Sequence, residues 1–447
     1  MASLQQSRNT SDDKMATEPK SLEILDKQLP APRKAYSLVK ERIDTELLES
    51  VWVGLGWGLV IGFLTDKLFG LNVLVVVLLI LLLYIWLRYR SVWRFDKALK
   101  TERFEDLLDM ARTAIEKHPK KIDPYCYAAA ACLSMHRPDD ALGFYDQAIS
   151  IKPQEPVFLL GRAQAYGTLF DGEHALADVN EFIRLRPNKA IGYFVRATAF
   201  YALYRYEDAI KDVNRAIELN VSKAFELRGC RDAARINRAL FNLGLNKLNE
   251  ATAECEELFD ALSTRPSAHE LGYVLQVKGL VLKRRSRFDE AIADFTQALE
   301  MCPKIKAPLL IHRSDALCAL GRFDEALIDL DLAEKQVLFP YLQANVHRIR
   351  ASVYLRKGEI DRAVEEANKG TNVRSDLPPV LSTYGLVLMH AGQLDKAKTM
   401  LDQAISLDPC HAEAYWFRHE LYEKLNEPEK AANDKQIAET YEYKPYI

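Results

Sequence analysis

The sequence has few of the features that mark secreted or nucleic-acid-binding proteins. Its 447 residues contain only seven cysteines, an odd number with no C-x-x-C pair and no zinc-like spacing. This argues against a disulfide framework and indicates a reducing compartment, where cysteine serves as a small apolar side chain. The 60 basic and 63 acidic residues almost cancel, leaving a net charge of −3. No bulk field therefore favours nucleic acid or an acidic partner.

Sequence patterns that carry catalysis or phosphate binding are also missing. The nine histidines are scattered without an H-E-x-x-H pair, and there is no G-x-x-x-x-G-K loop or G-x-S-x-G elbow. Acidic pairs such as Asp139-Asp140 and Asp324-Glu325 open predicted helices, where carboxylates favour the positive end of the helix dipole. We therefore expect a protein that is not an enzyme and that needs no metal or other cofactor.

The first 46 residues lack the pattern of a secretory signal. Residues 1–32 are polar and have no basic start followed by an apolar run, so we expect a disordered tail. Between Tyr36 and Leu47 the apolar residues recur at helical spacing, with charged residues between them. That spacing fits a short helix lying on a membrane surface, and equally the polar start of the next segment.

Two apolar runs follow, one long and one short. Leu68 to Leu87 is about long enough to span a bilayer, whereas Val51 to Leu64 is short unless it begins at Leu47 and continues toward Gly70. The short run carries a stripe of small residues that lets two helix backbones touch inside lipid. The stripe consists of three glycines spaced by four, Gly54, Gly58 and Gly62.

Basic residues lie on both sides of these runs, and only Lys67 lies between them. Because cytoplasmic flanks carry an excess of Lys and Arg, this distribution favours a transmembrane hairpin at 47–87 with both ends in the cytoplasm. A single span remains the alternative. We expect the protein in a membrane, with its larger part on the cytoplasmic side, and the hairpin offers a surface for oligomerisation.

Beyond the apolar runs the sequence repeats itself every 34 residues. Small residues recur early in predicted second helices, at Ala141, Ala175 and Ala209, where they allow a preceding helix to approach closely. One turn later a larger residue fills the layer beneath, such as Tyr145 or its counterparts Val179 and Val213. Prolines near the unit ends stop one helix before the next unit begins.

This pattern resembles the tetratricopeptide repeat over residues 88 to 445. The resemblance implies an all-α superhelical solenoid of about nine to ten helix pairs, preceded by one or two transmembrane helices. We expect regular arrays at 88–223 and 272–447, joined by one longer, degenerate unit or connector at 224–271. Glycines occupy turns between paired helices, where a left-handed backbone is needed. These are Gly321, Gly358 and Gly392.

The junction between the apolar runs and the array contains no helix breaker. No Gly or Pro occurs between Val73 and His118. We therefore expect one unbroken helix to leave the bilayer and become the first helix of the array, which would form a rigid mount. A frayed basic segment is the alternative.

The repeat resemblance also implies a binding groove lined by the first helices of successive units. Its inward positions would suit an apolar partner segment in the first array and an acidic one in the second. They fall on Leu160, Phe194 and Tyr201, and then on Gln276, Lys283, Arg348 and Ser352. The aromatic members fit ordinary packing between helices equally well. Members of the family that clamp a terminal carboxylate use Lys and Asn where this chain has Cys126, Leu160 and Phe194, so that ligand class is not expected.

Two functions follow from these expectations. The first is a membrane-anchored scaffold that binds an extended peptide or a helix of a partner protein at the cytoplasmic face, for assembly or recruitment of a complex. The second is an accessory subunit of a membrane enzyme or transporter, with the glycine-striped hairpin as its main contact.

Overall fold

The computed structural model describes residues 103–135, 137–221, 228–264, 268–302, 305–336 and 339–443, together with Phe95, Lys97, Ala98 and Thr101. The predicted tail and transmembrane hairpin, with Gly54, Gly58 and Gly62, lie outside these residues, as does most of the predicted continuous helix. Over the part of the chain that is described, no helix combines the length and the apolar character that crossing a membrane requires.

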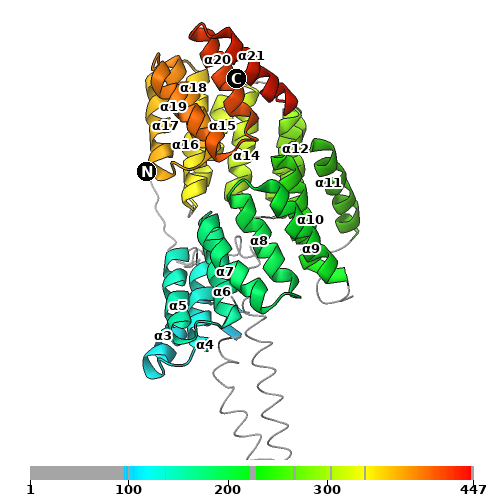
Figure 1. Cartoon of the computed structure of the whole chain (residues 1–447), viewed down its shortest axis with the longest axis vertical. Helices are drawn as coiled ribbons and strands as arrows, with labels where there is room; N and C mark the ends of the chain where they lie inside the picture. Colours follow the sequence, from blue (N-terminus) through cyan, green and yellow to red (C-terminus); the bar gives the residue numbers. More distant parts are fainter. Residues whose placement is uncertain are drawn as a thin grey trace, which may run out of the picture.

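The described residues form 19 α-helices, labelled α3 to α21, which confirms the all-α repeat architecture (Figure 1). Helix α3 (Phe104–Lys117) comes first, and nine helix pairs follow it. The pairs are α4 (Asp123–Ser134) with α5 (Pro138–Ile151), α6 (Pro156–Thr168) with α7 (Gly172–Leu185), α8 (Ala190–Ala202) with α9 (Tyr206–Val221), α10 (Arg228–Gly244) with α11 (Leu248–Ser263), α12 (Ala268–Arg284) with α13 (Phe288–Met301), α14 (Lys306–Ala319) with α15 (Phe323–Glu334), α16 (Pro340–Arg356) with α17 (Ile360–Val373), α18 (Pro378–His390) with α19 (Leu394–Leu407), and α20 (Ala412–Lys424) with α21 (Pro428–Thr440).

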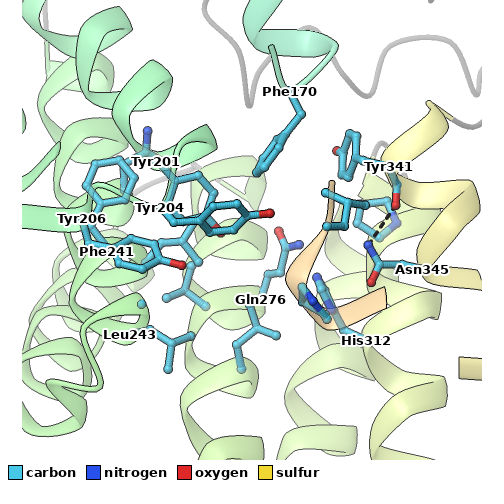
Figure 2. A pocket seen from close by; sticks show the side chains of 18 of the residues that line it. Phe170, Tyr201, Tyr204, Tyr206, Phe241, Leu243, Gln276, His312, Tyr341 and Asn345 are labelled. Carbon is cyan, nitrogen blue, oxygen red and sulfur yellow. Dashed lines mark hydrogen bonds between the residues drawn. The ribbon is translucent and has the colours of Figure 1, made fainter. Parts of the chain in front are cut away.

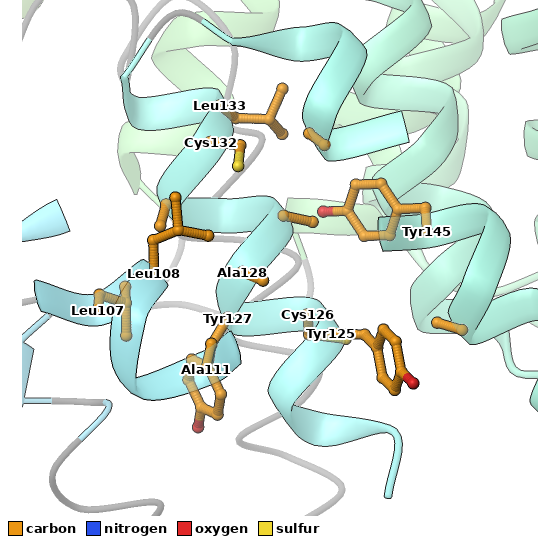
Figure 3. Packing of buried hydrophobic residues seen from close by; sticks show 14 of the residues in the cluster. Leu107, Leu108, Ala111, Tyr125, Cys126, Tyr127, Ala128, Cys132, Leu133 and Tyr145 are labelled. Carbon is orange, nitrogen blue, oxygen red and sulfur yellow. The ribbon is translucent and has the colours of Figure 1, made fainter. Parts of the chain in front are cut away.

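The core of each pair forms around the small residue predicted early in its second helix. These alanines are all fully or almost fully buried, which lets the paired helices approach closely. They are Ala141, Ala175, Ala209, Ala251, Ala291, Ala326, Ala363, Ala397 and Ala431. The larger residues one turn on, such as Tyr145, are also buried. We call the buried apolar core of α3, α4, α5 and the adjoining part of α6 the first cluster. Figure 3 shows its packing, with Tyr145 lying across from α4.

The first cluster already includes residues that precede α3. Phe95 and Ala98 are buried, and the Phe95 ring stacks on Tyr127 of α4 with 4.7 Å between ring centroids. The array therefore begins at or before Phe95, close to the end of the apolar run at Leu87.

Charged side chains join successive pairs in a recurring way. Arg196 of α8 donates two hydrogen bonds to the carboxylate of Asp212 in α9, at 2.6 and 2.8 Å. Its third nitrogen donates to the Asn180 side chain in α7 of the preceding pair (3.1 Å). Arg162, Arg313 and Arg418 make the same kind of bridge in their own pairs. Each arginine lies on the first helix of its pair. It links the second helix of that pair to the second helix of the preceding pair.

Turns between paired helices need a residue with a positive φ angle. Gly321, Gly358 and Gly392 take this position with φ of 75°, 78° and 75°, as predicted. In other pairs the same turn position holds a side chain, including Phe170 (φ 60°) and Tyr204 (φ 58°). A left-handed backbone costs such residues about 1–2 kcal/mol, so their side chains need a compensating contact.

The solenoid curves so that helix pairs far apart in the sequence come into contact. We call α6 to α10 the first arm and α16 to α19 the second arm. Figure 1 shows the arm of α16 to α19 lying next to the α6 to α8 region on the left of the molecule. The contacts between them come from the ends of helices and the turns, where Phe170 packs against Leu377 and Val380. Both arms line a partly open cavity on the inner face, which is the candidate site.

Candidate functional site

The central feature of the inner face is a cavity of about 530 Å³ lined by both arms of the superhelix. This volume lies within the range of small-molecule sites in proteins. Its walls come from turns and inward faces of helices between α6 and α20, and from Tyr443 near the C-terminus. One wall is aromatic and the other carries charged and polar groups.

The aromatic wall combines residues of α6 to α10 and the turns between them with Tyr341 of α16. Figure 2 shows Phe170 reaching from its turn into the space between Tyr204 on one side and Tyr341 on the other. The Phe170 and Tyr341 rings stack at 5.7 Å between centroids, and Phe170 meets Tyr201 edge-on at 6.0 Å. Tyr201 in turn lies 5.3 Å from Phe241 of α10. Such contacts between rings add about 0.5–1.5 kcal/mol each beyond the burial of apolar area.

Two hydrogen bonds reinforce this closure at the rim of the cavity. The Tyr206 hydroxyl at the start of α9 donates to Asp408 Oδ2 after α19, at 3.1 Å. The Arg374 guanidinium donates to the carbonyl oxygen of Leu169 at 2.8 Å and is itself held by two bonds to Asp376. Together with the Phe170–Tyr341 stack, these contacts form what we call the closure contacts.

The charged wall is centred on Asp315 of α14. Its carboxylate accepts from Lys283 of α12 (2.5 Å) and from Arg348 of α16 (3.2 Å). Burial by itself would raise the pKa of Asp315, but the two cations hold it well below its usual range. Arg284 donates to the Asn246 side chain (3.1 Å), and no carboxylate of the described residues lies within 4.0 Å of it.

Burial also shifts the pKa values of two histidines and two further carboxyl groups that line the cavity. Burial lowers the pKa of His312 to about 3 and that of His411 to about 4, so both imidazoles are neutral near pH 7. Burial also raises the pKa of Glu413 and of Asp408. Among the residues the structure describes, no three His, Cys, Asp or Glu side chains are placed to hold a metal ion.

Four of the seven predicted groove residues lie together in this cavity. Tyr201 belongs to its aromatic wall, Lys283 and Arg348 belong to its charged wall, and Gln276 lies between the two walls. Four of the inward positions inferred from the repeat resemblance therefore line one space. Partner binding at these residues stays a prediction.

The other three predicted residues lie in helix packing instead. Leu160 and Phe194 are 0% and 4% exposed within the core that joins α6, α7 and α8. Ser352 is buried on α16 and donates to the carbonyl oxygen of Arg348. Cys126, the remaining position of the terminal-carboxylate clamp, is buried in the first cluster.

Sequence reasoning did not identify Phe170 and Tyr204, which shape the aromatic wall. Both stand at the turn position that other pairs give to glycine, 34 residues apart. Large aromatic residues at a position that demands a left-handed backbone were the available signal, because such strain persists only where other contacts hold it.

Six of the seven cysteines have side chains that the structure describes. All six are free, as the sequence predicts, and five of them are buried. Burial raises the pKa of the Cys132 and Cys318 thiols to about 11 and that of Cys255 to about 12. These thiols are therefore protonated and unreactive at neutral pH.

The comparison with protein families finds repeats in two places. The tetratricopeptide repeat family model matches residues 273–305, which cover most of α12 and α13, and residues 378–410, which cover α18 and α19. No curated protein sequence matches the chain.

Three solved structures match this chain over most of its length. The hetero-tetramer Cut9–Hcn1 of the APC/C is 16% identical, with a TM-score of 0.49, and the match covers 78% of this chain and 71% of that chain. Yeast Tom70 is 13% identical, with a TM-score of 0.38 and coverage of 79% and 91%. A human IFIT1 dimer with PPP-AAAA is 12% identical, with a TM-score of 0.48 and coverage of 80% and 88%.

Repeats of the same helix-pair kind fill the rest of the described array, with the predicted small residue buried in each. The chain therefore contains tetratricopeptide repeats stacked into an α-helical solenoid, an architecture that generally mediates protein–protein interaction.

Proposed function

We propose that this protein is a membrane-anchored scaffold that binds partner proteins on its repeat array at the cytoplasmic face of a membrane. The anchor in this proposal is the apolar stretch 47–87, whose basic flanks favour both ends in the cytoplasm. The array supplies the binding surface, as stacked helix pairs generally do.

The observation that carries the proposal is the short stretch of chain between anchor and array. Phe95, which already packs against Tyr127, is eight residues beyond Leu87 (95 − 87). If these residues are helical, they span only about 12 Å. This supports a rigid mount that holds the array close to the membrane surface, in contrast to a long tether.

The anchor is tested by removing it without disturbing the first cluster. A chain that begins at Arg88 keeps Phe95 and Ala98, both buried in that cluster. We expect the full chain to remain with membranes after alkaline washing and the shortened chain to be released. In sealed vesicles with the cytoplasmic face outside, added protease is expected to reach the array. Release of the full chain, or protection of the array, would contradict the proposal.

The binding role is tested by replacing residues 47–87 with an unrelated transmembrane hairpin. Affinity purification in mild detergent then compares the partners of the two chains. If partners bind the array, they are recovered with both anchors. Loss of the partners with the new anchor would favour the second candidate, an accessory subunit that contacts its complex through Gly54, Gly58 and Gly62.

The closure contacts bear on which surface a partner uses. A peptide running along the whole inner face would have to separate Phe170 from Tyr341 and Tyr206 from Asp408. A chain in which these contacts are weakened should therefore capture more of an inner-face partner. Capture by the outer surface would not change.

A further inference from the structure

The chain folds back on its own pair directly after α21, which packs along α20 at the C-terminal end of the array (Figure 1). The Glu442 N–H donates to the carbonyl oxygen of Glu439 at 2.9 Å, and the Tyr443 N–H donates to that of Ala438 at 3.1 Å. Glu442 has a left-handed backbone with φ of 53°. Turns of this kind follow the first helices of other pairs, as at Phe170. The same turn here directs the last described residues back toward α20.

The turn places Tyr443 at the cavity. Its side chain is part of the cavity lining, and its ring lies 6.1 Å from the ring of Trp416 on α20, between centroids. Two residues earlier, the Tyr441 hydroxyl donates to the carbonyl oxygen of Pro409 (3.4 Å) and to Sγ of Cys410 (3.8 Å). Cys410 also lines the cavity. We call Tyr441–Tyr443 the strap, because these residues lie across the part of the lining formed by Cys410 and α20.

Two features of the strap oppose its docking. The Tyr443 hydroxyl is buried and has no hydrogen-bond partner among the described residues, so docking removes it from water without compensation. Burial raises the pKa of this phenol; the nearby charge of Glu413 adds to the effect and that of Arg284 opposes it.

The second feature is the backbone of Glu442. Its side chain is exposed, and the left-handed conformation that it adopts is one that glycine takes at much lower cost. Its carboxylate also lies at the negative end of the α21 dipole. The burial of the Tyr443 ring therefore works against two unfavourable contributions. Segments held in this way open locally, well before the fold as a whole.

We propose that the strap is an autoinhibitory contact that covers one end of the cavity and opens while the repeat array stays folded. In the docked state Tyr443 fills space on the inner face that a side chain of a partner segment would need. A partner that reaches the inner face from this end has to displace it. This consequence rests on the protein-binding function proposed above, whereas the opening of the strap does not, and the opening is measured without a partner.

Cys410 provides a built-in reporter of this opening. Its free thiol is half-buried in contact with Tyr441, and burial raises its pKa. Opening of the strap exposes the sulfur and lets the pKa fall, and both changes speed alkylation. The full chain in mild detergent is treated with iodoacetamide, and mass spectrometry of its peptides gives the rate at each cysteine. Cys318, which is 3% exposed on α14, reports unfolding of the array itself.

Two variants of Tyr443 should change the rate at Cys410 in opposite directions. Tyr443→Ala removes the docked ring, and we expect alkylation of Cys410 at least about tenfold faster, with the rate at Cys318 unchanged. Tyr443→Phe keeps the ring and removes the unpartnered hydroxyl. We expect it to hold the strap more firmly and to slow alkylation of Cys410 about threefold or more.

A third variant changes the turn and leaves the docked ring in place. Glu442→Gly supplies the residue that the left-handed position favours, so it should also slow alkylation of Cys410. An unchanged rate at Cys410 in Tyr443→Ala would overturn the proposal, as would equal acceleration at Cys410 and Cys318, which would mean that the array itself unfolds. Alkylation of Cys410 at or above the native rate in Tyr443→Phe or Glu442→Gly would contradict the two costs assigned to the docked strap.

Discussion

Tyr206 donates a hydrogen bond to Asp408, a residue 202 positions further along the chain, at 3.1 Å. In most solenoids each repeat contacts only its neighbours, so stability is close to a sum of local terms. Here the closure contacts tie the first arm to the second. We therefore expect the two arms to unfold together more closely than an open array of the same length would.

The closure depends on Phe170, and its substitution by glycine should open the array. Phe170→Gly relieves a left-handed backbone but removes the ring that stacks on Tyr341 at 5.7 Å. We expect a net loss of about 1–3 kcal/mol, because truncation of a packed aromatic side chain outweighs the relief of strain. Small-angle scattering should show a larger radius of gyration.

Ser286 provides the matched control for this change. It has the same turn conformation, with φ of 58°, but its side chain is exposed. Ser286→Gly should therefore raise the melting temperature slightly and leave the scattering profile unchanged. If Phe170→Gly also left the profile unchanged, the closure would not depend on this ring.

The arginine bridges between successive pairs should contribute to stability where they are buried. Arg196→Met removes two bonds to Asp212, whose side chain is only 9% exposed, and the bond to Asn180. We expect a loss of about 1–3 kcal/mol, because the Asp212 carboxylate is left without its partner. Denaturant unfolding gives this value directly.

An exposed pair on the neighbouring helix serves as the control for Arg196. Arg184 pairs with Glu181 in α7, but its side chain is 63% exposed. Arg184→Met should change the free energy of unfolding much less than Arg196→Met does, as is usual for surface ion pairs. Similar losses in the two variants would show that burial is not what makes the bridge stabilising.

The sequence was sufficient to predict the helix pairs, because their signals are local. The alanines at 34-residue intervals and the glycines at Gly321, Gly358 and Gly392 depend only on packing and backbone geometry inside one unit. The longer unit predicted at 224–271 falls where α10 and α11 lie. The boundaries of the domains stay a prediction.

The closure could not be predicted in the same way, because it results from a rotation added at every pair. Small changes in packing between α9 and α12 would decide whether Phe170 meets Tyr341 or points into solvent. For the same reason, only some of the inward positions predicted from the sequence line the cavity. Tyr201 reaches the cavity, whereas Phe194, seven residues earlier on α8, packs into the core.

Paired helices approach each other closely at some glycines. Substitution of such a glycine by alanine therefore tests how tightly the core is packed. A Cβ atom on Gly279 would lie 2.5 Å from Cε1 of Phe295, whereas one on Gly143 would meet nothing within 4 Å. Gly279→Ala should cost about 1–3 kcal/mol through overpacking. Gly143→Ala should stabilise α5 by about 0.5–1 kcal/mol, since alanine favours the helix. Thermal melting of both variants checks the opposite signs.

Two buried carboxyl groups should respond to pH with opposite signs. Burial raises the pKa of Glu413, so its ionisation on raising the pH costs the folded state more than the unfolded state. Burial alone would also raise the pKa of Glu366, but His347 and Lys369 lower it to about 2, so ionised Glu366 stabilises the fold. Glu413→Gln should therefore raise the melting temperature at pH 7, and Glu366→Gln should lower it. The effect of Glu413→Gln should shrink as the pH falls toward 4, where an ordinary glutamate takes up its proton. The effect of Glu366→Gln should persist to lower pH and be lost between about pH 4.5 and the folded-state pKa of about 2. A Glu413→Gln variant that is less stable than the native chain at pH 7 would mean that Arg284 and Arg348 outweigh the cost of burying this carboxylate.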